Sequence, residues 1–144
     1  MNSGARRKGR EAALQMLYQS DLSRSENRAG VSDENSREHF WKHLAASRDG
    51  EAFATEIVRG FHESAEEIDK AIRAASHHWR LERMERVDLS ILRLATFELL
   101  KLDDVPSRVT LNEAIELAKR FGSEGSPGFI NGILDRIASD LGKD

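Results

Sequence analysis

The sequence contains no cysteine and only two prolines among its 144 residues. Without cysteine, the chain forms no disulfide, no cysteine-ligated zinc site and no cysteine nucleophile. Proline interrupts helices, so its scarcity leaves room for long ones. No apolar run approaches the roughly 20 residues that cross a bilayer, and the basic start lacks the apolar segment of a signal peptide. We expect a cytoplasmic protein with no membrane partner.

Sequence signatures of catalysis and of metal binding are missing as well. The sequence has no GxxxxGK[ST] phosphate loop and no GxSxG nucleophile motif. His39 and His43 would share one helix face, but no HExxH glutamate lies between them and no third ligand can be named. His77 and His78 are adjacent, so their side chains would point apart on a helix. We expect them to be solvated or to cap the backbone near a helix C-terminus. We predict a protein that is not an enzyme and that uses no metal and no cofactor.

Apolar residues recur at helical spacing along nearly the whole chain, and we find no alternation typical of strands. Ser64 with Glu67 predicts a capping box, and Ser126 before Pro127 predicts a helix N-cap. Residues 87–102 are apolar over most of a helix circumference, which is typical of the centre of a bundle. We predict an all-α fold in a single domain with subdomains of about 1–80 and 81–144. Its seven helices lie near residues 5–22, 40–45, 53–61, 65–75, 87–102, 108–121 and 127–141.

Positive charge is concentrated at the start of a chain whose net charge is -3. The first ten residues contain Arg6, Arg7, Lys8 and Arg10 and no acidic residue. Helical spacing would gather the three arginines along one side of the first turns. Cations at a helix N-terminus oppose the helix dipole, and bound phosphate would offset that cost. Charge alone leaves two readings open: a solvated terminus or a nucleic-acid contact.

A second basic feature is the segment AKRFGSEGSPGF, residues 118–129. Lys119 and Arg120 end one predicted helix, and the next helix begins with backbone N–H groups that can donate hydrogen bonds to a phosphate. Phe121 and Phe129 flank the loop, and either ring could stack on an unpaired base. An ordinary helix connection would also fit this pattern.

Four segments together resemble the NusB family of bacterial transcription antitermination factors: RRKGREAALQMLYQ, VDLSILRLATFEL, DVPSRVTLNEAIELAKRFGSEGS and FINGILD. The resemblance implies two three-helix bundles with an additional linking helix. It also implies an adaptor that binds the boxA element of RNA together with NusE, a small-subunit ribosomal protein. Such a complex, with other Nus factors, helps RNA polymerase resist termination, particularly in ribosomal RNA operons.

The resemblance also assigns site residues. It implies that the RNA-binding residues are Arg6, Arg7, Lys8, Arg10, Lys119, Arg120, Gly125, Ser126 and Phe129. It implies that the partner-binding residues are Tyr18, Glu85, Asp88 and Arg93. The resemblance implies that many relatives carry an aspartate in place of Gly125. Without that negative charge, the repulsion of RNA should be smaller. Asp88 could instead stabilise a helix start, and Arg93 could be a structural ion-pair member.

Two other functions remain open at this stage. Related domains occur as targeting modules of ribosomal RNA cytosine methyltransferases, in which case we expect a longer reading frame. A protein–protein scaffold without RNA binding is the third hypothesis. The sequence also leaves open whether the protein is a monomer or a homodimer, and whether Phe121 or Phe129 faces the ligand.

Overall fold

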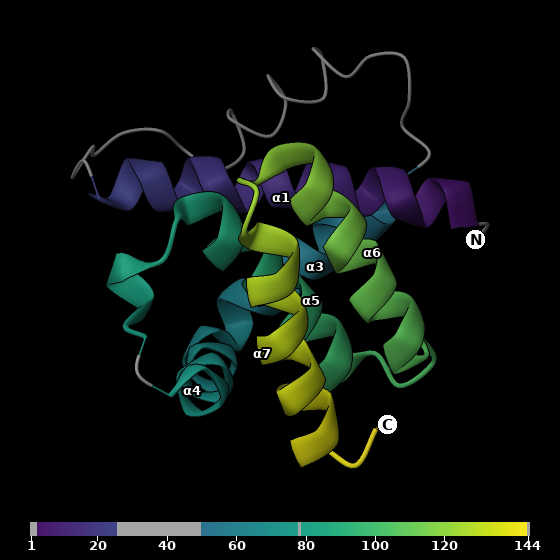
Figure 1. Cartoon of the computed structure of the whole chain (residues 1–144). Helices are drawn as coiled ribbons and strands as arrows, with labels where there is room; N and C mark the ends of the chain where they lie inside the picture. The colour runs from purple at the N-terminus through teal and green to yellow at the C-terminus, as the bar shows by residue number, and fades with distance from the viewer. Residues whose placement is uncertain (1–2, 26–49, 78, 144) are drawn as a thin grey trace. The chain divides into compact units, whose positions relative to one another are not determined.

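The computed structural model describes residues 3–25, 50–77 and 79–143 (Figure 1). Within these ranges the chain forms six α-helices, a short 3-10 helix and no strand, which confirms the all-α prediction. The helix expected near residues 40–45 lies outside them, as do His39, His43 and His78. The helices are α1 (Ser3–Ser25), α3 (Glu51–Glu63), α4 (Ala65–Ser76), α5 (Arg86–Lys101), α6 (Ser107–Phe121) and α7 (Ser126–Asp140), with the 3-10 helix η1 at Leu81–Arg83.

The chain divides into two compact units, residues 1–58 and residues 59–144. The division falls within α3, and each unit is described by itself. The subdomain boundary near residue 80 stays a prediction. None of the described helices is long and apolar enough to cross a membrane.

In the first unit, α1 and the start of α3 approach each other backbone to backbone. A Cβ atom on Gly9 would lie 2.8 Å from the carbonyl oxygen of Gly50. That oxygen accepts the N–H of Ala54, in the first turn of α3. Only residues without a side chain allow this approach. The predicted apolar stripe of α1 is buried at Ala13, Leu14 and Leu17.

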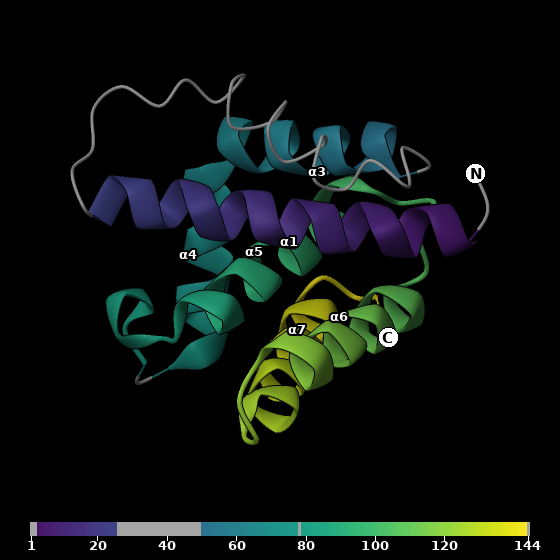
Figure 2. The ribbon, with the colours of Figure 1, turned by 90° about the horizontal axis from the view of Figure 1, so that it is seen from above.

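In the second unit, α5 is the central helix. Its buried residues run from Asp88 to Leu92 and from Leu94 to Leu99, so nearly its whole circumference is covered. It packs against α4, α6 and α7, while α6 and α7 run antiparallel and lie side by side (Figures 1 and 2). Buried Glu98 accepts a 3.1 Å hydrogen bond from Thr110 of α6, so this carboxylate has a partner in the core. The prediction of a central apolar helix is confirmed.

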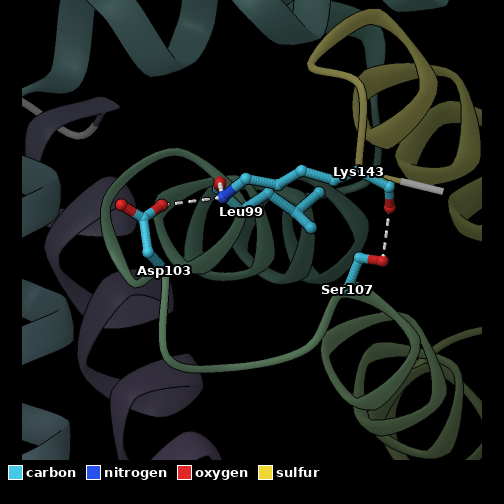
Figure 3. Close-up of polar contacts among 4 residues, drawn as sticks. All are labelled: Leu99, Asp103, Ser107 and Lys143. Atoms are coloured by element: carbon cyan, nitrogen blue, oxygen red, sulfur yellow. Dashed lines mark hydrogen bonds and ion pairs between the residues drawn. The ribbon is translucent and has the colours of Figure 1, made fainter.

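The C-terminal end of the chain is fastened to the end of α5 (Figure 3). The Lys143 ammonium donates to the carbonyl oxygen of Leu99, in the last turn of the helix, and lies 3.1 Å from an Asp103 carboxylate oxygen. Ser107, the first residue of α6, donates its hydroxyl to the Lys143 carbonyl. Helix ends leave carbonyl groups without intrahelical partners, and a lysine nearby satisfies one of them.

The capping box predicted at Ser64 is wrong. Ser64 does precede α4, but its side chain makes no capping hydrogen bond, and its backbone (φ −121°, ψ 24°) is not extended as a cap requires. Its N–H donates to the Gly60 carbonyl and its carbonyl accepts the Ile68 N–H, so helical bonding continues across the junction. At the other end of α4, His77 is exposed and occupies the C-cap with φ 57°, as expected for a residue at a helix terminus.

Gly60 offers a test of the packing against α5. A Cβ atom at this position would overlap the ring of Phe97, so Gly60→Ala forces the ring or the helix to move. We expect a loss of about 1–3 kcal/mol in the free energy of unfolding, measured by urea denaturation. Gly132→Ala is the matched control in α7, because its Cβ meets no atom within 4 Å. Alanine should stabilise that helix by roughly 0.5–1 kcal/mol. Equal effects of the two changes would contradict this packing.

Candidate nucleic-acid interface

The four cations at the start of α1 differ in exposure. Arg7 and Lys8 are exposed, Arg6 is half-buried, and Arg10 is only 3% exposed. The guanidinium carbons of Arg6 and Arg10 lie 5.1 and 5.2 Å from the centre of the Phe53 ring. Of the three arginines predicted to cluster along one side, Arg6 and Arg10 share the Phe53 ring, whereas Arg7 is exposed. Two of them turn toward Phe53, because an arginine stem and its planar charge both pack favourably on an aromatic face.

The loop between α6 and α7 closes tightly on Ser126. The Ser126 hydroxyl accepts the N–H of Ser123 at 2.9 Å, and the side chain is 1% exposed. A Cβ atom on Gly122 would lie 2.6 Å from that hydroxyl oxygen, so the turn requires glycine there. The predicted N-cap is wrong by one residue: Gly125 is the N-cap of α7, and Ser126 begins the helix. The serine side chain points into the loop because Ser123 supplies it with a donor.

The cations and aromatic rings beside this loop are accessible. Lys119 and Arg120 are exposed in the last turn of α6, and the Arg120 guanidinium carbon lies 4.9 Å from the centre of the Phe121 ring. Gly125 is exposed too, with open space where a side chain would begin. Phe129 is half-buried and meets Trp79 edge to face. The α7 N-terminus thus lies between a basic helix end and an aromatic pair.

Asp88, in the first turn of α5, belongs to the same region of the second unit. Its carboxyl group is buried, and Oδ1 has no hydrogen-bond partner. Burial raises the pKa of Asp88, a hydrogen bond with Ser126 lowers it, and the charge of Glu85 raises it further. The Ser123 hydroxyl lies 3.4 Å from a Glu85 carboxylate oxygen. The start of α5 and the α6–α7 loop are therefore joined, which the sequence alone does not indicate.

Arg93 of α5 forms a bidentate ion pair with a carboxylate of α4. Its Nε and one terminal nitrogen each lie 3.0 Å from a carboxylate oxygen of Asp69. Its guanidinium carbon is 5.2 Å from the centre of the Phe61 ring. Arg93 is therefore a structural ion-pair member, which was the alternative to a partner-binding role. Its contact with a partner stays a prediction. Tyr18 is half-buried and Glu85 exposed, and their partner roles stay predictions too.

Sequence reasoning did not single out Trp79, whose exposure is 54%. The only signal in the sequence is a tryptophan directly before Arg80, in a stretch without helical periodicity. Among residues 3–25, 50–77 and 79–143, no group of three or more histidine, aspartate or glutamate side chains could hold a metal ion.

The NusB family model matches residues 7–139. The chain belongs to the NusB family. A transcription antitermination protein NusB from Geobacter sulfurreducens is 54% identical over 138 residues, which cover 96% of this chain and 96% of that protein. The protein of the same name from Sorangium cellulosum is 49% identical over 140 residues, which cover 97% of this chain and 96% of the relative.

Solved structures share the fold. T. maritima NusB superposes with a TM-score of 0.81 and 38% identity, covering 94% of this chain and 91% of that one. A structure of the antitermination factors NusB and NusE in complex with dsRNA gives a TM-score of 0.82 at 23% identity, covering 96% of this chain and 99% of that one. At that lower identity the likeness shows the fold alone.

The packing of Arg10 on Phe53 leads to a prediction about stability. Arg10→Ala removes the buried stem and the cation–π contact, and we expect it to destabilise the protein by about 1–2 kcal/mol. Lys8→Ala is the control, because Lys8 is exposed on the same turn and surface changes usually stay within about 0.5 kcal/mol. Thermal unfolding of the two variants checks this. A melting temperature for Arg10→Ala that matches the control would contradict it.

Asp88 leads to a prediction about pH. Because burial raises the pKa of Asp88 above its ordinary value of 3.8, the folded state keeps the proton that the unfolded state releases. The contribution of Asp88 to the free energy of unfolding is fully present below pH 3.8. It is lost as the pH rises through the raised pKa. Asparagine cannot ionise, yet it keeps an oxygen for Ser126. We expect Asp88→Asn to raise the melting temperature at pH 7 and to flatten its fall with rising pH.

Asp135→Asn is the control for this measurement, because Asp135 is exposed on α7. The control should leave the pH dependence of the melting temperature as in the parent protein. A lower melting temperature at pH 7 for Asp88→Asn, with the parent's pH dependence retained, would show that the carboxylate is not penalised by burial.

Proposed function

We propose that this protein is a transcription antitermination adaptor that binds boxA-type single-stranded RNA together with NusE. The observation that carries the proposal is its similarity, at 49–54% identity over nearly the whole of both chains, to proteins named for transcription antitermination. In this proposal it acts in the cytoplasm without catalysing a reaction. It helps RNA polymerase and the other Nus factors pass terminators, particularly in ribosomal RNA operons. The chain shares its fold with a NusB that was solved in complex with NusE and dsRNA.

In this proposal RNA phosphates contact the exposed cations. Arg7 and Lys8 in the first unit, and Lys119 and Arg120 in the second, carry charge at the surface. Phosphate contacts of this kind position RNA and do not read its sequence. The α7 N-terminus adds backbone N–H groups, which attract phosphate. The open space at Gly125 lets RNA approach those groups closely.

The buried site residues have supporting roles in the proposal. Ser126 shapes the loop that presents Gly125, and Arg6 and Arg10 hold the first turns of α1 on Phe53. For the protein partner, exposed Glu85 and half-buried Tyr18 provide contacts. Asp88 is buried and Arg93 is ion-paired with Asp69, so in this proposal both residues hold α5 in place.

The test is RNA binding, measured by fluorescence anisotropy with a labelled boxA-type RNA, with and without NusE, at several salt concentrations. We expect weak binding by the protein alone, clearly tighter binding with NusE, and affinity that falls as salt rises, because counterions leave the RNA on binding. A scrambled RNA of equal length is the probe control. Salt-independent binding, or no binding even with NusE, would contradict the proposal. No binding would favour the alternative of a protein–protein scaffold without RNA binding.

The exposed cations of α1 provide a matched pair of variants. Arg7→Ala with Lys8→Ala should weaken binding to every RNA sequence and reduce the slope of log affinity against log salt by about 1.4, since each phosphate contact with a single strand contributes roughly 0.7. Asp135→Asn is the control, because it changes one charge on an exposed side chain of α7. An unchanged salt slope in the double variant would exclude phosphate contacts at this terminus.

A further inference from the structure

Trp79 is the most exposed of the large apolar side chains in the described part of the chain, at 54%. It lies between α4 and η1 and meets Phe129 of α7 edge to face, with ring centres 5.5 Å apart and planes at 73°. In such a pair the edge of one ring covers a single face of the other. At least one full face of the indole therefore stays uncovered by Phe129.

The backbone of Trp79 is held in place from α4. Its N–H donates to the Ser76 carbonyl at 3.3 Å, and its carbonyl accepts the Ser76 hydroxyl at 3.3 Å. Ser76 itself is buried at the last position of α4. Two hydrogen bonds thus hold the Trp79 backbone, and one ring contact holds the indole. An exposed aromatic ring with a fixed position loses little conformational freedom when a flat ligand stacks on it.

The charges around the pair identify the kind of ligand. Exposed Arg80 and Arg83 follow Trp79, and exposed Lys119 and Arg120 precede the helix that carries Phe129. The exposed anions beside them are Glu82, Glu85 and Glu124, and the Lys119 ammonium lies 3.5 Å from Glu116 of α6. The first turn of α7 has no acidic residue. An exposed aromatic face flanked by exposed arginines matches an unpaired nucleobase joined to phosphates.

We propose that Trp79 is a stacking surface for an unpaired base of single-stranded RNA. The edge-to-face contact with Phe129 fixes the orientation of the indole. This subsite rests on the proposed RNA-binding function and adds a contact to bases, whereas the exposed cations contact phosphates. It predicts that the protein binds the bases of a single strand near residues 79–83 through stacking, with little preference among sequences.

The direct test uses the fluorescence of Trp79. The chain has two tryptophans, so Trp41→Phe leaves Trp79 as the only one. This protein, together with a NusE partner whose tryptophans are replaced, is titrated with a boxA-type RNA and with an abasic ribose-phosphate strand of equal length. We expect quenching of Trp79 by the intact RNA and none by the abasic strand, because only a base can stack on the indole.

Affinity provides the second readout. Trp79→Ala should weaken binding of intact RNA by about five- to a hundredfold, the effect of losing one stacked base. It should leave the salt slope unchanged, because the phosphate contacts remain. Trp79→Phe should restore most of the affinity. Leu141→Ala is the matched control, since Leu141 is another exposed apolar side chain in the same unit, at 40%.

The outcomes separate this subsite from the proposed function. RNA binding by the parent protein without quenching, and with unchanged affinity in Trp79→Ala, would overturn the subsite and leave the adaptor proposal standing. Weaker binding of NusE in Trp79→Ala, with RNA affinity unchanged, would also overturn it, because the indole would then contact protein. Failure of the parent protein to bind RNA in the presence of NusE would overturn the adaptor proposal itself.

Discussion

Helix α5 is buried around nearly its whole circumference, and helices α4, α6 and α7 of the second unit are arranged by their contacts with it. A helix with almost no solvent face needs neighbours on nearly every side, and α4, α6 and α7 are three of them. The close approach of Gly60 to the Phe97 ring shows how little free space is left. The candidate loop between α6 and α7 is positioned by the same packing.

Polar contacts at the two ends of α5 complete this arrangement. Near its start, Asp88 is hydrogen-bonded to Ser126, in the first turn of α7. At its end, Lys143 satisfies the Leu99 carbonyl and pairs with Asp103. A buried carboxyl group with an unfilled oxygen costs stability. Its position nevertheless joins the central helix to the loop that carries the exposed Gly125, so core packing and the candidate RNA surface are linked through one side chain.

The arginines of this protein show how one residue type takes two roles. Arg10 packs on Phe53, and Arg93 pairs with Asp69 above Phe61, so both charges are used inside a unit. Arg7 and Arg120 are exposed. The planar guanidinium can stack on a ring and bind a carboxylate or phosphate in the same orientation. A count of cations therefore overstates the charge that RNA can reach.

Much of the fold follows from local pattern. Helical spacing of apolar residues predicts the six described helices to within a few residues, and the all-round apolar segment at residues 87–102 predicts the central helix. These features depend on neighbours along the chain, so the sequence by itself determines them. Capping was predicted less well at Ser64 and Ser126, because a cap depends on the local backbone and on which donors approach.

What only the tertiary structure decided is which side chains reach solvent. Arg10 and Arg7 have the same charge and stand three residues apart, yet Arg10 is buried over Phe53 and Arg7 is exposed. Asp88 and Ser126 were predicted for separate roles, yet they share a hydrogen bond across 38 positions of sequence. Trp79 is exposed while most large apolar side chains of its unit are buried. Burial depends on residues distant in the sequence, so no local pattern contains it.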